Sequence, residues 1–331
     1  MIIIIGASGF IGTYLTDRLF ADGKSVLATG RSASAEKYYK SRNIPYVRLD
    51  ISSKQDFEKL PAQGVEAVVL LAALLPANVS EENPYSYVDI NITGTLNVLE
   101  YCKKIGVKKL LSTTSYADIQ NLWQKDVPLA SDSPRSYKLN GDHAVYVISK
   151  NAATDLILHY NEEYGMSGTI FRLPPVYGVG PHGELYVDGK WYKSGFQVFI
   201  EKAMSGEDIE IYGDKTISRD VVYVKDVVMA FIKAIESPRA KGVYNITSGM
   251  AHTLEEQVKD IIEVFSPEKK KSRIVHRPEI PNHSQSYLFD IKKAQKDFNY
   301  MPQYVPFRTL LLDYKEEMEK SRFEHLLNHQ K

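Results

Sequence analysis

The sequence predicts an α/β protein built on a doubly wound, mostly parallel sheet, followed by a smaller α/β region. Strand-like apolar runs alternate with helix-like amphipathic segments over the first 173 residues, and this alternation is typical of βαβ units with right-handed crossovers. In addition, three glycines at positions 6, 9 and 12 follow the first apolar run directly. Both observations favour a sheet whose binding site lies at the carboxyl ends of its strands.

The elements of the first half follow from hydrophobic periodicity. Residues 2–5 are four isoleucines, the pattern of a strand buried on both faces. In the next segment, apolar side chains such as Phe10, Tyr14 and Leu15 recur at helical spacing. Further strands are predicted at 25–29, 46–49, 66–72, 109–112 and 168–173, and helices at 84–105 and 142–164.

The regular alternation ends at Pro174 and Pro175, because proline cannot continue a central strand. A hairpin turning at Asp188-Gly189 is expected at 185–192. Beyond it, the pattern predicts helices at 197–205, 225–236 and 307–327, and strands at 209–212 and 243–246. We therefore expect one domain at 1–173 plus about 219–246, and a second at 174–218 plus about 247–328.

Composition restricts the classes of function. Of the 331 residues, 44% are apolar, and Lys+Arg and Asp+Glu both number 41. A chain without net charge has no field that would attract nucleic acid or an anionic membrane. The single cysteine, Cys102, indicates a reducing compartment, and no apolar run is long enough to be a signal peptide or membrane span. We expect a cytoplasmic protein with no metal site.

The glycines at the start of the chain predict a phosphate-binding loop. Gly6-Ala-Ser8-Gly9-Phe10-Ile11-Gly12 lies between the first strand and the first helix. Glycine permits a tight turn and a close approach of the backbone to a pyrophosphate, which would rest on the helix N-terminus. The first domain is thus a Rossmann domain for NAD or NADP, and the second is expected to bind substrate.

The end of the second strand favours NADP. NAD-selective Rossmann sites carry an acidic residue there, whereas this chain has Gly30, Arg31 and Ser32. Arg31 offers a guanidinium to a 2′-phosphate, with Ser32 beside it. Alternatively, Arg31 faces solvent and the site accepts either dinucleotide. After the third strand, Asp50 and Ile51 are placed to contact the adenine.

A tyrosine and a lysine four residues apart form the candidate catalytic pair. Tyr146 and Lys150 would share one helical face. A nearby cation favours the phenolate and would lower the pKa of the tyrosine, which could then exchange a proton with a substrate hydroxyl. The cluster 112–115 (Ser-Thr-Thr-Ser) ends the preceding strand and could supply a further hydroxyl to the substrate oxygen.

With these motifs the sequence resembles the extended short-chain dehydrogenase/reductase family, in its NAD(P)-dependent epimerase/dehydratase branch. The likeness covers nearly the whole chain. The resemblance implies that Thr114, Tyr146 and Lys150 are catalytic, and that substrate contacts Thr114 and Ser115. Its cofactor and substrate motifs also include Leu71-Ala72-Ala73, Asn91 within 91–97, Val176-Tyr177-Gly178, Tyr116 and Arg219, with further signatures at 212–214, 224–226 and 244–249.

Two departures limit the substrate prediction. Family dehydratases have an Asp-Glu pair after the catalytic threonine, but Thr114 is followed by Ser115-Tyr116, so a dehydratase is not expected. Where many nucleotide-sugar epimerases have an asparagine, this chain has Pro175, which has no donor. Arg219 could clamp a diphosphate, or it could form an ion pair with a loop carboxylate.

The leading hypothesis is an NAD(P)-dependent epimerase or ketoreductase acting on a secondary alcohol of a nucleotide sugar. The alternatives are an NADPH-dependent reductase of another carbonyl compound and a non-catalytic dinucleotide-binding protein. The family often dimerises through two helices, and the apolar residues available on them are Val88, Leu99, Ile157 and Leu158; we expect a homodimer. The hairpin near His182 and Trp191 could be a lid or a surface loop.

Overall fold

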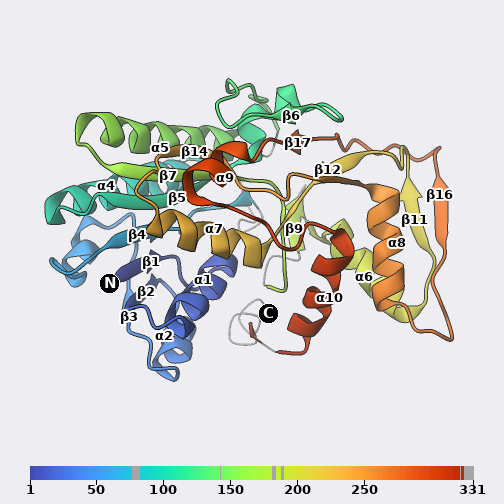
Figure 1. Cartoon of the computed structure of the whole chain (residues 1–331), viewed down its shortest axis with the longest axis horizontal. Coiled ribbons are helices and arrows are strands. Elements are labelled where there is room, and N and C mark those ends of the chain that lie inside the picture. The colour runs from blue at the N-terminus through green and yellow to red at the C-terminus, as the bar shows by residue number, and fades with distance from the viewer. Residues whose placement is uncertain (77–82, 142, 181–183, 188–189, 321, 324–331) are drawn as a thin grey trace.

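A computed structural model of the chain contains a seven-stranded sheet, in the order β14-β7-β5-β4-β1-β2-β3 (Figure 1). The structure describes residues 1–76, 83–141, 143–180, 184–187, 190–320 and 322–323. All six neighbouring pairs of the sheet are parallel. The strands are β1 (Ile2–Ile5), β2 (Val26–Gly30), β3 (Tyr46–Arg48), β4 (Ala67–Leu70), β5 (Lys109–Ser115), β7 (Ser167–Leu173) and β14 (Gly242–Asn245). The predicted doubly wound α/β fold is therefore confirmed.

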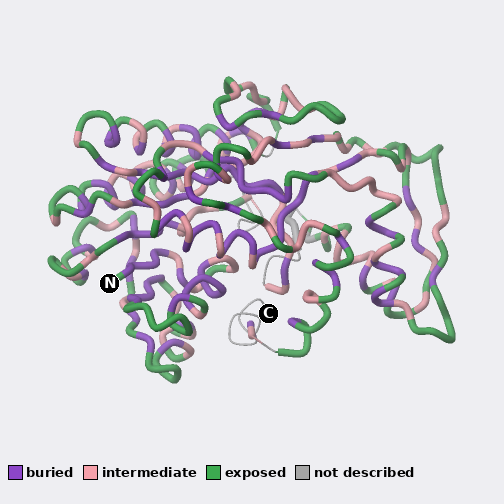
Figure 2. Tube along the Cα trace, viewed as in Figure 1, coloured by how far each residue is buried: buried purple, intermediate pink, exposed green. Residues whose placement is uncertain are grey.

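Helices cover both faces of this sheet. Figure 1 shows α4 (Gly94–Ile105) and α5 (Ala144–Glu163) on one face, and α1 (Phe10–Ala21) and α7 (Val224–Glu236) on the other. Successive side chains of a strand point to opposite faces. Accordingly, Ile2 and Ile4 belong to the core cluster that includes α1 and α7, whereas Ile3 and Ile5 belong to the cluster that includes α4 and α5. Burial of β1 on both faces explains its uninterrupted apolar sequence (Figure 2).

Shorter sheets form beside the central one. β11 (Ile209–Tyr212) pairs in parallel with β16 (Ile274–Arg277), and β12 (Ser218–Asp220) pairs in the antiparallel sense with β15 (Ala251–Thr253). Three further pairs are β8 (Val176–Tyr177) with β13 (Val222–Tyr223), β6 (Pro128–Leu129) with β17 (Leu288–Phe289), and β9 (Glu184–Val187) with β10 (Lys190–Lys193). The remaining helices are α2 (Ala33–Lys40), α3 (Pro84–Tyr87), α6 (Gly195–Ser205), α8 (Leu254–Phe265), α9 (Lys292–Phe298) and α10 (Phe307–Met318).

Several boundaries differ from the sequence-based prediction. Strand β5 continues to Ser115, because residues 109–115 pair along their whole length with β7. The helix expected at 84–105 contains a π-helical stretch at Val88–Thr93. The last helix ends at Met318 rather than near 327. The hairpin strands are present, but the turn at 188–189, His182 and the side chain of Trp191 lie outside what the structure describes. In the described ranges, no helix is both long and apolar enough to cross a membrane.

Candidate active site

A cavity of about 1010 Å³ lies at the carboxyl ends of the central strands. Its lining residues follow six of these strands: Gly6 after β1, Arg31 after β2, Asp50 after β3, Leu71 after β4, Ser115 in β5 and Pro174 after β7. This edge is where open α/β sheets bind their ligands. Both halves of the chain contribute to the cavity, since Arg219 and residues 283–285 and 287 also line it.

The glycine loop at one end of the cavity requires glycine on steric grounds. Gly6 has φ +92°, and a Cβ there would lie 2.5 Å from the backbone nitrogen of Ala72. At Gly12 a Cβ would lie 2.2 Å from the carbonyl oxygen of Gly6. Gly9 is the N-cap of α1, and no side chain caps the helix there. The first-turn amides of α1 are therefore suited to bind an anion such as a pyrophosphate.

Of the residues expected near the adenosine half of the dinucleotide, some line the cavity and one does not. Arg31 is exposed and lines the cavity, as do Asp50 and Ile51. One carboxylate oxygen of Asp50 accepts hydrogen bonds from the backbone nitrogen and hydroxyl of Ser52, at 3.0 and 2.7 Å. By contrast, Ser32 does not line the cavity. Its hydroxyl caps α2 by accepting a hydrogen bond from the backbone nitrogen of Ala35 at 3.3 Å.

Thr114, Tyr146 and Lys150 line the same cavity as the glycine loop. Thr114 is only 4% exposed, and its hydroxyl has no hydrogen-bond partner in the described part of the chain. Lys150 is 6% exposed, and no described carboxylate pairs with its ammonium group. A buried hydroxyl or ammonium group normally has a partner. These groups are therefore suited to contact a polar ligand in the cavity.

Burial dominates the titration of the candidate catalytic pair, Tyr146 and Lys150. It lowers the pKa of Lys150 from its ordinary value of 10.5 to about 8. Burial also raises the pKa of Tyr146, and the neighbouring Tyr87 and Tyr116 raise it further. The expectation that Lys150 lowers the pKa of this phenol is thus wrong for the protein alone. The physical reason is that burial removes the phenol from water and so disfavours the phenolate, while the neighbouring lysine does not offset this.

Most of the other predicted site residues lie where the sequence places them. The cavity lining includes Ser8, Gly9, Phe10, Ile11, Ala72, Ala73, Ser115, Tyr116, Val176 and Arg219. Two residues do not line it. Asn91 is buried and bridges the loop after β4 to α5: it accepts from the backbone nitrogen of Leu74 at 2.8 Å and donates to the hydroxyl of Ser149 at 2.9 Å. Tyr177 instead stacks on Phe196, with ring centroids 4.3 Å apart.

Sequence reasoning missed an aromatic wall at the far end of the cavity. The rings of Tyr116 and Trp123 stack with centroids 4.8 Å apart, and both contact the ring of Tyr287. The indole nitrogen of Trp123 and the hydroxyl of Tyr287 are buried without a described hydrogen-bond partner. Trp123 comes shortly after the predicted hydroxyl cluster in the sequence, so its proximity to the site could have been inferred from the sequence. Tyr287 comes from a distant segment and is brought in by its bridge to Arg219.

A buried ion pair supports the floor of the site and was also missed. The Arg172 guanidinium donates to both carboxylate oxygens of Asp118, with distances of 2.8 to 3.1 Å, and both side chains are at most 4% exposed. It also donates to the backbone oxygen of Ser131 and to the amide oxygen of Asn245. The pair joins β5 and its following turn to β7 and β14. An arginine inside a predicted central strand was the signal for such a partner.

Comparison with known proteins agrees with this geometry. Residues 2–247 match the model of the NAD dependent epimerase/dehydratase family. A UDP-glucuronate 4-epimerase of Thermodesulfobacterium geofontis is 30% identical over 317 residues, covering 91% of each chain. A putative UDP-glucose 4-epimerase of Methanocaldococcus jannaschii is 28% identical over 304 residues, covering 89% of this chain and 91% of that one.

Among solved structures, the UDP-glucose 4-epimerase of Thermotoga maritima with UDP-glucose superposes with a TM-score of 0.78. It is 26% identical, and the match covers 97% of this chain and 99% of that one. The similarity of sequence and structure extends over nearly the full length of the chain. The glycine loop and the cavity beside it agree with the same family assignment. The chain belongs to the NAD dependent epimerase/dehydratase family of enzymes.

Proposed function

We propose that this enzyme is an epimerase that oxidises and re-reduces a secondary alcohol of a UDP-sugar, with Thr114, Tyr146 and Lys150 as its catalytic residues. The observation that carries the proposal is the hydroxyl of Thr114. It is buried without a described partner, in the cavity that also contains the glycine loop, Tyr146 and Lys150. An unsatisfied hydroxyl in such a place is explained by a ligand oxygen that completes its hydrogen bonding.

Each of the three residues has a distinct role in this proposal. A dinucleotide bound on the glycine loop would accept a hydride from the sugar and return it. Tyr146 takes the proton of the sugar hydroxyl and gives it back, and no described residue engages its hydroxyl by a hydrogen bond. Lys150, with a pKa of about 8, is mainly cationic at neutral pH and would donate to the ribose hydroxyls of the dinucleotide. Thr114 orients the reacting oxygen.

The choice of an epimerase and of UDP-sugars rests on two kinds of support. All three relatives described above carry the names of 4-epimerases of UDP-sugars, one of them as a putative one. Within this chain, Thr114 is followed by Ser115-Tyr116, so the carboxyl pair that would eliminate water in a dehydratase does not follow it. We assign Arg219, which lines the cavity and whose backbone bridges to Tyr287 of the aromatic wall, to the diphosphate. Ser115 and Tyr116 are assigned to the sugar.

The test is to mix the purified protein with UDP-glucose, UDP-glucuronate, and GDP- and dTDP-sugars without added dinucleotide. An epimerase interconverts one of these with its 4-epimer and needs no stoichiometric reductant. If conversion instead consumes one NADPH per product, the enzyme is a ketoreductase and the proposal is wrong. Tyr146→Phe is the matched control, because it keeps the ring and removes the titrating hydroxyl; it should abolish turnover and keep dinucleotide binding.

For the cofactor we propose a preference for NADP within this NAD-dependent family. Gly30 and Arg31 stand where NAD-selective sites have a carboxylate, and Arg31 is exposed at the cavity. The test compares Arg31→Ala with the wild type. If Arg31 binds a 2′-phosphate, the variant should lose roughly tenfold or more in NADP affinity and keep its NAD affinity. Equal loss for both dinucleotides would contradict the preference.

Three further expectations remain proposals. Residues 1–173 with about 219–246 would bind the dinucleotide, and 174–218 with about 247–328 would bind substrate. For a homodimer through α4 and α5, the expected apolar set must be corrected: Leu99 and Ile157 are fully buried in the core, whereas Val88 is 45% exposed. Sedimentation velocity would test the dimer. The buried, single Cys102 is compatible with the proposed cytoplasmic location.

A further inference from the structure

The C-terminal residues 317–320, 322 and 323, here called the C-terminal clamp, lie against the outer side of α1. Phe323 is 2% exposed. Its ring centroid lies 5.5 Å from that of Tyr14 and 6.4 Å from that of Phe10. Arg322 lies over the ring of Tyr14 at 4.8 Å and pairs with Asp17 at 2.5 Å. The clamp therefore covers the first two turns of the helix that begins at the glycine loop.

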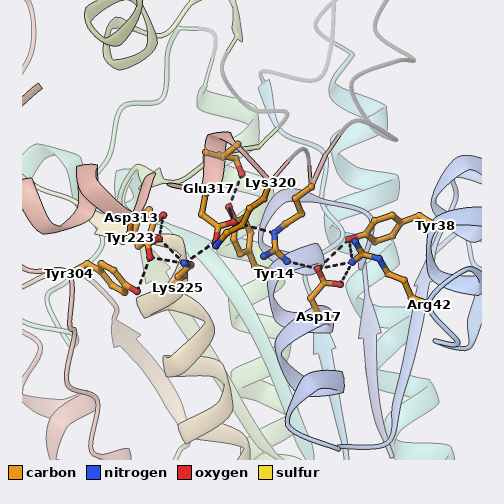
Figure 3. Close-up of polar contacts among 12 residues, drawn as sticks. Tyr14, Asp17, Tyr38, Arg42, Tyr223, Lys225, Tyr304, Asp313, Glu317 and Lys320 are labelled. Atoms are coloured by element: carbon orange, nitrogen blue, oxygen red, sulfur yellow. Dashed lines mark hydrogen bonds and ion pairs between the residues drawn. The ribbon is translucent and has the colours of Figure 1, made fainter. Parts of the chain in front are cut away.

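A buried carboxylate anchors the clamp to the rest of the fold. Glu317 is 1% exposed and pairs with Lys225 of α7 at 3.0 Å, with Lys320 at 2.9 Å and with Arg322 at 3.3 Å. Burial alone would raise the pKa of Glu317, but these cations outweigh it and hold the pKa at about 2. Figure 3 shows Asp313, Lys225, Glu317 and Asp17 in this chain of contacts, in which Arg322 links Glu317 to Asp17. The carboxylate is thus charged at all physiological pH values.

Phe10 connects the clamp to the dinucleotide end of the cavity. It is the first residue of α1 and it lines the cavity. A Cβ on Gly178 would lie 2.7 Å from the Phe10 ring. The ring is therefore in close contact with the chain at Gly178 as well as near Phe323. Tyr14 adds a second connection, since its hydroxyl donates to the backbone oxygen of Val179 at 3.1 Å.

We propose that the C-terminal clamp is a positioning element for the dinucleotide. By fixing Phe10 and Tyr14, it sets the position of the first turn of α1, whose amides would bind the pyrophosphate. This inference rests on the proposed dinucleotide site at the glycine loop. Because two coupled events affect each other equally, dinucleotide binding in turn stabilises the docked clamp.

The first experiment measures the dissociation constants of NADH and NADPH by fluorescence titration. Phe323→Ala removes the ring that contacts Phe10 and Tyr14, and Arg322→Gln removes the pairing with Asp17. Each should weaken dinucleotide binding by roughly 2- to 30-fold, the range typical of coupling through packed side chains. Phe323→Leu, which keeps an apolar contact, should recover most of the affinity. The matched control is Arg308→Gln, because Arg308 lies on α10 but pairs with Glu263 of α8.

The second experiment uses limited trypsin digestion at Lys320 and Arg322, which lie within the clamp itself. In the wild type, the dinucleotide should slow cleavage at these sites. At the same dinucleotide concentration, it should slow cleavage of the Phe323→Ala variant less. A purely structural role would leave this protection unchanged once the site is saturated. If the wild type binds the dinucleotide and both variants bind it equally well, this inference alone is wrong. If the wild type binds no dinucleotide, the proposed function is wrong as well.

Discussion

Lys150→Met should stabilise the dinucleotide-free protein at neutral pH while it abolishes catalysis. Burial lowers the pKa of Lys150 from 10.5 to about 8, and no described carboxylate offsets the buried charge. The depressed pKa corresponds to about 3 kcal/mol of destabilisation of the folded state by the charged form. Methionine has nearly the same length and no charge, so the substitution removes this cost.

The sign of the effect follows from proton linkage. Below pH 8 Lys150 is charged in both the folded and unfolded states, so the cost is fully present. Between about pH 8 and 10.5 the folded protein releases the proton first, so the unfolded state binds more protons and the stability of the wild type rises with pH. The advantage of Lys150→Met in urea denaturation should therefore be largest at pH 7 and should shrink toward pH 10.5.

A second lysine, Lys109, provides the matched control. The Lys109 ammonium donates to the backbone oxygens of Ala234 at 3.3 Å, Ile235 at 2.8 Å and Ser237 at 2.5 Å, close to the C-terminus of α7. Burial lowers the pKa of Lys109 too, but these three acceptors compensate its charge, so Lys109→Met should lose about 1 to 3 kcal/mol of stability at pH 7. If Lys150→Met were also destabilised at pH 7, or if its difference from the wild type did not change with pH, the reasoning from an uncompensated charge would be refuted.

Two other substitutions test the loop and the floor of the site. Gly12→Ala should weaken dinucleotide binding by roughly tenfold or more, because the new Cβ would lie 2.2 Å from the carbonyl oxygen of Gly6; calorimetric titration measures this, and wild-type affinity would contradict the steric argument. Asp118→Ala should lower the free energy of unfolding by about 3 to 5 kcal/mol, since it leaves Arg172 charged and buried. The double variant Asp118→Ala/Arg172→Met should recover part of that loss in urea denaturation, and no recovery would mean that lost packing is the cause.

The sequence was sufficient for the sheet and for the part of the site formed at its edge. Each strand of the sheet is marked by its own apolar run, and the residue after each strand reaches the common edge by geometry alone. For this reason Gly6, Arg31, Asp50 and the hydroxyl cluster 112–115 could be assigned to one site without knowledge of any contact, whereas the choice of Thr114 within that cluster rests on the family resemblance. Element boundaries were less well predicted where pairing decides them, as at β5, whose partner β7 extends it to Ser115.

Features that depend on contacts between distant segments were not predictable in this way. Tyr287 joins the aromatic wall only because its segment bridges to Arg219. Tyr177 was assigned to substrate by its motif, but it stacks on Phe196 of α6, a partner that no periodicity indicates. The titration of Tyr146 was predicted with the wrong sign, because the spacing to Lys150 reveals a possible attraction and says nothing of how far both groups are withdrawn from water.

Two cationic side chains near the same sheet edge show how a supporting residue differs from one proposed to be catalytic. The Arg172 guanidinium is buried and donates to Asp118, Ser131 and Asn245, so folding alone satisfies it. Lys150 is equally buried, but the described chain provides no such set of acceptors. Since an unpaired buried charge destabilises the protein that carries it, the ligand in the proposed function would supply the missing partner. The same reasoning applies to the Thr114 hydroxyl, and in the proposed function the reacting part of the ligand would lie near these two residues.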